Sequence, residues 1–187
     1  VLKEFWDFKK IEKKKKKYKI KKPKVITAIG MFYDLENPMK FIKDISDSLD
    51  KDGVFIAQLM CLKSMLNQND FGNICHEHLE FYTFKSLKYL FESNGLKIFK
   101  VEENDINGGS YRIFCKKNIT RSISYKENTS IKYIKKFLNR VENNKTKLMK
   151  FIKKQSMNNK KVFVYGASTK GNSLLQYYKI DKKIVPY

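Results

Sequence analysis

The chain has 187 residues, of which 42% are apolar and 14% aromatic, so it can bury a core and is not disordered throughout. Lys and Arg number 40 against 19 Asp and Glu, a net charge of +21 that is typical of proteins binding nucleic acid or an anionic surface. No apolar run approaches the roughly eighteen residues that span a bilayer, so we expect a cytoplasmic protein without a membrane partner.

The positive charge has an explanation that requires no nucleic acid. The Lys residues are spread over nearly every segment instead of forming one stripe, and abundant Lys, Asn and Ile are typical of an AT-rich genome. The longest Lys run, residues 13–17, is interpreted as a solvated helix face or a connector. We therefore expect attraction to phosphate-bearing small molecules and keep a nucleic-acid-binding protein as an alternative.

The cysteines and the chain ends narrow the class of protein further. Cys61, Cys75 and Cys115 are odd in number and have no CxxC spacing, which argues against a disulfide framework and against a structural zinc site. The chain starts without Met and stops just after residues 183–185, which resemble a strand that has barely begun. We expect a piece of a longer protein from a reducing compartment, and the sequence does not predict its oligomeric state.

The first part of the chain has a strand, helix, strand pattern. Residues 24–29 form a short apolar run rich in β-branched side chains, which predicts a buried parallel strand and not an alternating edge strand. A helix is predicted from Pro38, and residues 54–59 form a second buried strand. This order predicts a right-handed crossover unit. The apolar face of the helix comprises Phe41, Ile42, Ile45 and Leu49.

A second helix and a hairpin follow. Thr83 is the expected N-cap of the helix and Gly95 its C-cap. Residues 96–101 and 110–115 are strand-like, and the polar, Gly-containing link between them is short enough for antiparallel pairing. Few nucleotide-binding folds end a parallel sheet with an antiparallel strand. The expected buried side chains of the helix are Leu87, Leu90 and Phe91.

The last part of the chain predicts a linker, a long helix and a second α/β unit. Residues 117–128 have no clear period, whereas residues 130–154 carry apolar positions at helical spacing with an interruption near Lys145. Residues 162–165 begin a strand again, and a Gly-rich turn leads from them into a helix that continues to Tyr178.

Both histidines lie in one short segment, CHEHLEFY at residues 75–82. A His whose tautomer is fixed by a carboxylate is the arrangement that a general base needs. If the segment is extended, His76 and His78 point to opposite sides. Three interpretations stay open, namely a proton-transfer site, two structural imidazoles, and a metal site that includes Cys75. We expect no metal, and the preference for the proton-transfer site rests on the family resemblance described below.

Two further motifs could bind an anion. The sequence GASTKGNS at residues 166–173 nearly matches a P-loop but has Asn172 where the phosphate-binding Lys must stand, which disfavours an NTPase and leaves an anion site or a structural turn. The sequence NDINGGSYR at residues 104–112 is either an ordinary polar hairpin or a ligand-binding one. Arg112 within a strand requires an anionic partner from the protein or from a ligand.

Together these motifs resemble the class I methyltransferases that add a methyl group to a carbon of nucleotide-linked keto-deoxysugars. The resemblance covers almost the whole chain, and its most specific element is the HEH segment followed by the NDxNGGS hairpin. The matching stretches are residues 25–38, 52–55, 73–82, 104–112 and 164–172.

The resemblance implies an α/β fold, with the carboxy-terminal half of a Rossmann-like class I methyltransferase sheet ending in an antiparallel hairpin and the start of a second Rossmann-like α/β domain. Residues 1–117 would be a partial methyltransferase domain without the glycine-rich cofactor motif. Residues 118–158 would be a linker and a long amphipathic helix, and residues 159–187 an incomplete carboxy-terminal domain. The family's zinc-binding module would precede Val1, so zinc is expected only there.

The resemblance also implies S-adenosylmethionine-dependent C-methylation of a nucleotide-sugar, impaired in this chain, with a non-catalytic remnant or anion-binding module as the alternative. His78, flanked by Glu77, would remove the proton next to the sugar ketone, and the resulting enolate would attack the methyl group. The implied cofactor contacts are Ile29, Gly30 and Met31. The implied substrate contacts are Tyr33, Cys75, Asn107, Ser110 and Arg112.

Overall fold

The computed structural model describes residues 5–186. Their contacts divide the described residues into two compact units, one made of residues 5–64 and 79–127 and the other of residues 65–78 and 128–186. This division differs from the expected domains, because residues 65–78 group with the carboxy-terminal part of the chain and not with the sheet that flanks them in sequence. The two units are described separately below.

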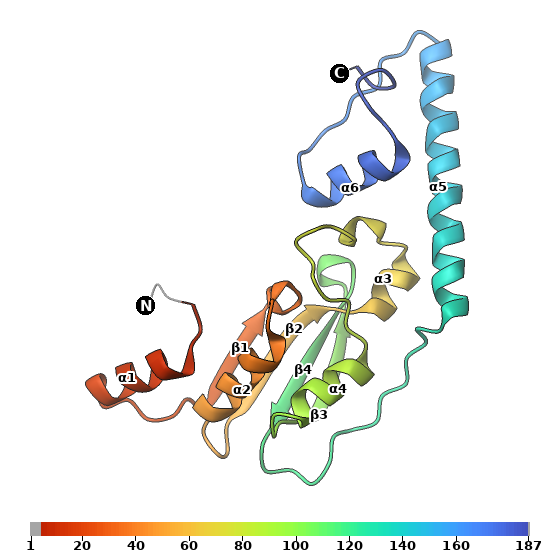
Figure 1. Cartoon of the computed structure of the whole chain (residues 1–187). Coiled ribbons are helices and arrows are strands. Elements are labelled where there is room, and N and C mark those ends of the chain that lie inside the picture. The colour runs from red at the N-terminus through yellow and green to blue at the C-terminus, as the bar shows by residue number, and fades with distance from the viewer. Residues whose placement is uncertain (1–4, 187) are drawn as a thin grey trace. The chain divides into compact units, whose positions relative to one another are not determined.

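The first unit is a four-stranded sheet with the strand order β1-β2-β4-β3 (Figure 1). Strand β1 (Val25–Ile29) is parallel to β2 (Val54–Met60). Strand β4 (Ser110–Lys116) is antiparallel to both β2 and β3 (Lys97–Asn104). The expected parallel pair and the expected hairpin are therefore confirmed, and the fold is mixed α/β.

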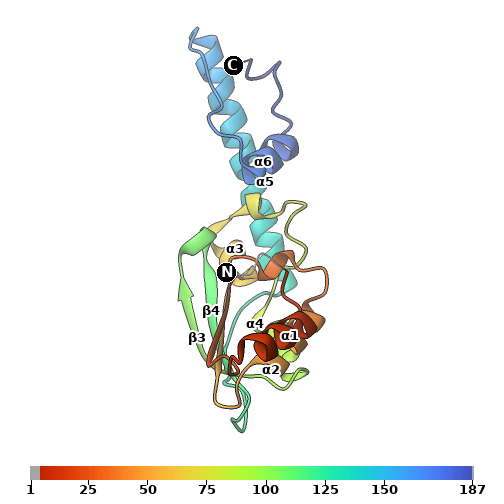
Figure 2. The ribbon, with the colours of Figure 1, turned by 90° about the vertical axis from the view of Figure 1, so that its left-hand side faces the viewer.

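Helices α2 (Pro38–Ser48) and α4 (Phe84–Glu92) cover the same face of this sheet (Figure 2). The predicted apolar positions of α2 pack into the core, because Ile42, Ile45 and Leu49 have no exposed surface. Figure 2 shows no helix of the first unit on the other face of β3 and β4. The sheet is therefore packed on one side within this unit.

Strand β1 corrects one expectation. It is parallel, as predicted, but its burial alternates, because Ile26 and Ala28 are buried while Val25 is 57% and Ile29 58% exposed. Among the described strands β1 pairs only with β2, so it is an edge strand. A continuous apolar run indicates burial on both faces, yet here only the face toward α2 is covered.

Helix α4 begins as predicted, with Thr83 as its N-cap, but its C-cap is Ser93 and not Gly95. Thr83 and Ser86 form a capping box, in which each side chain bonds the main-chain N–H of the other. At the other end Gly95 has φ +74°, and the N–H of Leu96 bonds the carbonyl of Phe91 at 3.0 Å. This is the Schellman pattern that ends a helix at a residue with positive φ.

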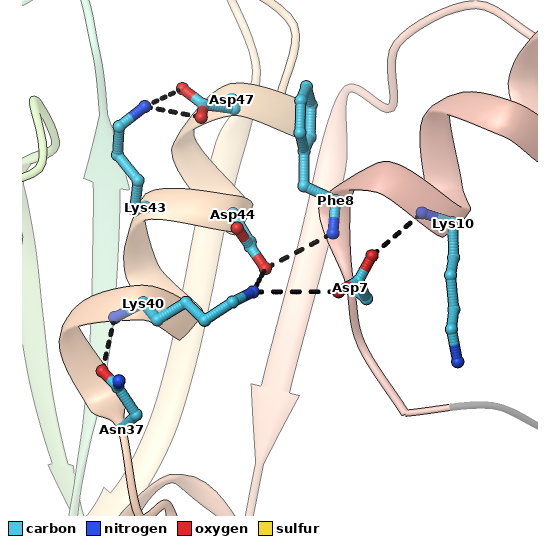
Figure 3. A network of polar contacts seen from close by, with 8 residues as sticks. All are labelled: Asp7, Phe8, Lys10, Asn37, Lys40, Lys43, Asp44 and Asp47. Carbon is cyan, nitrogen blue, oxygen red and sulfur yellow. Dashed lines mark hydrogen bonds and ion pairs between the residues drawn. The ribbon is translucent and has the colours of Figure 1, made fainter.

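Helix α1 (Phe8–Tyr18) contains the whole Lys run of residues 13–17 and has no buried residue, which agrees with a solvated helix face. Its start is joined to α2 through Asp44, which is 8% exposed (Figure 3). The Asp44 carboxylate accepts the main-chain N–H of Phe8 at 3.3 Å and pairs with Lys40 at 2.6 Å. Charged side chains therefore connect the two helices without burying α1.

Short elements connect the larger ones. Helix α3 (Leu62–Gln68) was not predicted, and three single 3₁₀ turns, η1 (Phe32–Asp34), η2 (Phe71–Asn73) and η3 (Ile106–Gly108), lie in loops. The expected linker is extended and is held to β3 where the N–H of Ile98 donates to the Ser122 hydroxyl at 3.0 Å.

The second unit contains the long helix α5 (Ile131–Met157) and the helix α6 (Thr169–Tyr178). The predicted long helix is confirmed, and α5 is continuous through Lys145, where the spacing of apolar residues is interrupted. The predicted strand at residues 162–165 is wrong. A strand needs a neighbouring strand for its hydrogen bonds, and the described part of this unit contains none. Within residues 5–186 no helix is both long enough and apolar enough to cross a membrane.

Candidate functional site

The loop that follows β1 lies where the two parallel strands end, which is the edge of an α/β sheet where ligands bind. Gly30 has φ +69°, and its N–H donates to the carbonyl of Gln58 at 2.9 Å. An ideal Cβ built on Gly30 would meet no atom within 4 Å, so the backbone here is open to an approaching group. The Tyr33 hydroxyl donates to the Gly30 carbonyl at 3.2 Å and holds the turn.

The strand register brings the predicted cofactor loop and Arg112 into one row of the sheet. Ile29 pairs with Gln58, Gln58 with Arg112, and Arg112 with Glu102. Residues opposite one another in a register point to the same face, so these four side chains share the face that α2 and α4 leave uncovered. This neighbourhood joins residues more than eighty positions apart, and the sequence alone does not show it.

Arg112 has the partners that its place in a strand requires. Its Nε and Nη2 atoms donate to the Gln58 Oε1 at 3.0 and 2.8 Å, and its Nη1 lies 3.6 Å from the Glu102 carboxylate. The side chain is 40% exposed, so the guanidinium is not buried. The structure thus supplies the expected anion from the protein, and the ion pair is loose enough for a stronger anion to compete with Glu102.

Two predicted ligand contacts in the hairpin loop differ: Asn107 is exposed, whereas Ser110 forms a hydrogen bond within the loop. Asn107 has φ 54° and is exposed, and the two glycines that follow also have positive φ. The Ser110 hydroxyl is 1% exposed and donates to the Ile106 carbonyl at 2.8 Å. Asn107 is therefore accessible to a ligand, whereas the Ser110 hydroxyl proton is engaged in closing the loop.

Tyr33 links the loop after β1 to the chain that follows the HEH motif. Its side chain is 6% exposed, and its main-chain carbonyl accepts the N–H groups of Leu79 at 3.0 Å and Glu80 at 3.1 Å. Leu79 is the next residue after His78 in the sequence. Tyr33 thus has a structural role within the first unit.

In the second unit the HEH motif forms a turn. The segment is therefore not extended, so the expectation that His76 and His78 point to opposite sides of an extended strand does not apply. The His78 N–H donates to the Cys75 carbonyl at 3.2 Å. The Nδ1 atom of the half-buried His78 ring lies 2.7 Å from the main-chain carbonyl of Asn73. A carbonyl only accepts, so Nδ1 carries the hydrogen and the basic lone pair of the neutral ring is on Nε2.

The two neighbours of His78 in the motif differ from it. His76 and Glu77 are exposed, whereas the His78 ring is half-buried and meets the Asn73 carbonyl. The predicted task of fixing the tautomer is thus performed by Asn73, which sequence reasoning missed. In the sequence the only sign of this contact is an Asn five residues before a His. That spacing predicts a contact only when the chain between the two residues is known to form a turn.

Cys75 and the Gly-rich turn complete the predicted motifs. Cys75 is a half-buried free thiol, and in the described range no group of three His, Cys, Asp or Glu side chains could hold a metal ion. In the Gly-rich turn Ser168 is the N-cap of α6, and its hydroxyl accepts the Gly171 N–H at 3.1 Å. The expected strand-turn-helix is therefore reduced to a capped helix start.

Comparison with known proteins identifies the family. The model of a methyltransferase domain matches residues 3–101, just over half of the chain, and the model of the C-methyltransferase C-terminal domain matches residues 105–187. The C-methyltransferase NovU of Streptomyces niveus is 28% identical over 146 residues, and the match covers 72% of this chain and 35% of NovU. The chain thus spans about a third of the length of that relative.

Solved structures resemble the chain only distantly. LepI in complex with SAM is 10% identical with a TM-score of 0.40, and the match covers 51% of this chain and 26% of the LepI chain. LaPhzM is 13% identical with a TM-score of 0.41, and the match covers 50% of this chain and 30% of the LaPhzM chain. These likenesses carry no weight beside the two family models, which between them span both units. The chain therefore belongs to the methyltransferase domain family, and its carboxy-terminal part is matched by the model of the C-methyltransferase C-terminal domain.

Proposed function

We propose that this chain takes part in S-adenosylmethionine-dependent C-methylation of a nucleotide-linked keto-deoxysugar, with His78 as the general base. The observation that carries the proposal is the hydrogen bond from His78 Nδ1 to the Asn73 carbonyl, 2.7 Å long. This bond orients the ring and leaves Nε2 as the atom that accepts a proton. The family membership supplies the reaction class, and the NovU name supports the same class.

The proton comes from the carbon next to the sugar ketone, whose C–H is acidified by the carbonyl group. Nε2 accepts it, and the electron pair of the broken C–H bond moves into an enolate. Glu77 enters the proposal as a negative charge next to His78 in the chain. It would stabilise the imidazolium that proton transfer creates.

S-adenosylmethionine, when bound, supplies the electrophilic methyl group that the carbon takes up. The residues proposed to hold it are Ile29, Gly30 and Met31. Two observations support a fit, because the Gly30 backbone can be approached without a clash and the loop follows the end of a parallel strand.

The proposed substrate contacts are Tyr33, Cys75, Asn107, Ser110 and Arg112. Arg112 is the side chain suited to a diphosphate, since a guanidinium binds two phosphate oxygens at once and its ion pair with Glu102 is loose. Asn107 supports the proposal by its exposure, and its amide can both donate to and accept from sugar hydroxyls.

The proton-transfer step can be tested without a methyl donor. The full chain is incubated in D₂O with a nucleoside-diphosphate-linked keto-deoxysugar, and loss of the C–H signal next to the ketone is followed by NMR. We expect exchange above the buffer rate, and we expect His78→Gln to lose on the order of a hundredfold of it. His76→Gln is the matched control, because His76 lies in the same turn and is exposed. Equal exchange rates for the two variants would contradict the proposal.

A further inference from the structure

The turn that holds His78 is packed against helix α6, and this contact lies within the second unit. The Phe71 ring is 4.5 Å from the Tyr177 ring of α6, centroid to centroid. A Cβ added to Gly72 would lie 3.0 Å from the Lys170 Cβ and 3.2 Å from its carbonyl oxygen. The η2 turn is thus fitted closely to the first turn of α6, and a side chain at position 72 would require Lys170 to shift by a few tenths of an ångström.

A chain of polar contacts runs from α6 to the imidazole. The Lys170 ammonium lies 3.5 Å from Asp70 Oδ2, and the same oxygen accepts the Asn73 side-chain N–H at 2.7 Å. The Asn73 main-chain N–H also donates to the Asp70 carbonyl, at 3.3 Å. The carbonyl of Asn73 is the group that meets His78 Nδ1. Asp70 therefore holds the residue whose carbonyl fixes the His78 tautomer.

Asn73, which accounts for one end of this chain of contacts, is buried, so the contacts are not confined to the surface of the protein. Asn73 is 2% exposed, and its amide oxygen has no hydrogen-bond partner among the described residues. Burying an unpaired amide oxygen is unfavourable, so the amide is retained here for its other end, the N–H bonded to Asp70. The Asp70 side chain is 22% exposed and the Lys170 side chain 39%, so the charges are progressively more hydrated toward α6.

We propose that Asp70 is a positioning residue for His78, acting through Asn73 and oriented by Lys170. The inference rests on the proposed role of His78 as base. It extends that role by making the carboxy-terminal helix part of the proton-transfer machinery. The Lys of the Gly-rich motif thereby has a task within the protein that requires no bound phosphate.

The test reads the tautomer of His78 directly. The full chain is labelled with ¹⁵N-histidine, and long-range ¹H–¹⁵N spectra are recorded at a pH where the rings are neutral. Only two imidazoles contribute signals, and the exposed His76 is an internal reference. We expect the wild-type His78 to be in the Nδ1–H form. Asp70→Ala should shift it toward the Nε2–H form and leave His76 unchanged, whereas Asp70→Asn, which keeps an oxygen acceptor, should restore the wild-type signal.

Asp181→Ala is the matched control, because Asp181 caps a separate turn of the same unit by accepting the Lys183 N–H at 2.9 Å. It should leave the His78 signal as in the wild type. A wild-type His78 spectrum in folded Asp70→Ala would overturn the positioning role. If Asp70→Ala does not fold, Lys170→Gln is measured instead, because Lys170 is half-exposed. A smaller shift of the His78 tautomer in the same direction would support the proposal, and an unchanged His78 signal would overturn it.

The two proposals fail separately. The tautomer is measured without substrate, so it is independent of whether His78 catalyses exchange. Loss of the tautomer effect with His78-dependent exchange intact would remove Asp70 from the mechanism and leave the base in place. The reverse outcome, a tautomer set by Asp70 without any exchange, would refute the proposed function alone.

Discussion

The Tyr111 hydroxyl donates a hydrogen bond of 2.9 Å to the Glu127 carboxylate. The other oxygen of that carboxylate accepts the main-chain N–H of Phe84, the first residue of α4, at 2.7 Å. Tyr111 is fully buried in β4, and burial raises the pKa of its phenol far above the ordinary value. One linker residue therefore satisfies a buried hydroxyl and the start of a helix within the first unit.

We expect Glu127→Ala to lower the free energy of unfolding by about 2 kcal/mol, because the buried Tyr111 hydroxyl loses its acceptor. Glu127→Gln keeps an acceptor oxygen and should lose less than half of that. Urea denaturation followed by tyrosine fluorescence measures both changes. Lys126→Ala, at an exposed neighbouring position, is the control and should leave the midpoint unchanged. An unaltered midpoint for Glu127→Ala would show that the linker does not stabilise the sheet.

The three thiols should differ in reactivity. Burial raises the pKa of Cys61 and of Cys115, so neither forms the reactive thiolate readily, whereas Cys75 is only half-buried. Brief treatment with iodoacetamide near neutral pH, followed by peptide mass spectrometry, should find Cys75 modified first. Cys75→Ser should abolish the rapid phase. Rapid modification of Cys115 would instead mean that the sheet opens.

Arg112→Lys should weaken binding of a nucleoside diphosphate by about tenfold, or about 1.4 kcal/mol, because an ammonium cannot bind two phosphate oxygens in one plane. Calorimetric titration of the full chain measures this. The control is Arg121→Lys, since Arg121 is an exposed Arg of the linker. Equal losses for both variants would indicate general charge attraction in place of a defined contact.

Local patterns were sufficient for the elements of the first unit. The apolar face of α2, the N-cap Thr83 and the Gly-containing hairpin depend on residues within a few positions of each other, and all were predicted correctly. The burial of β1 was predicted wrongly because it depends on what covers its second face, which no local pattern states. The strand expected at residues 162–165 failed for the same kind of reason, since pairing requires a distant partner.

The candidate site was predictable only as a set of residue types. The HEH segment was singled out because it holds both imidazoles, but its turn, and the Asn73 carbonyl that fixes the ring, follow from the packing of η2. The row that joins Ile29 to Arg112 through Gln58 depends on strand register. Register is set by pairings across the whole sheet, so such neighbours are not visible in one segment.

Glu103 should make the stability of the first unit depend on pH. The Lys63 ammonium, 2.7 Å away, and then the Tyr125 hydroxyl hold the Glu103 pKa below its ordinary value of 4.5. A carboxyl whose folded pKa is lowered stabilises the protein above its unfolded pKa, and this stability is lost as pH falls through the folded pKa. The side chain is 44% exposed, so the contribution should stay below about 1 kcal/mol.

Urea denaturation midpoints measured at about pH 6 and about pH 3 should therefore differ less in Glu103→Gln than in the wild type. Glu92→Gln is the control, because Glu92 is exposed on α4 and is in none of the ion pairs of the described residues. It should show the same pH dependence as the wild type. An equal pH dependence in Glu103→Gln and the wild type would mean that other carboxylates carry it.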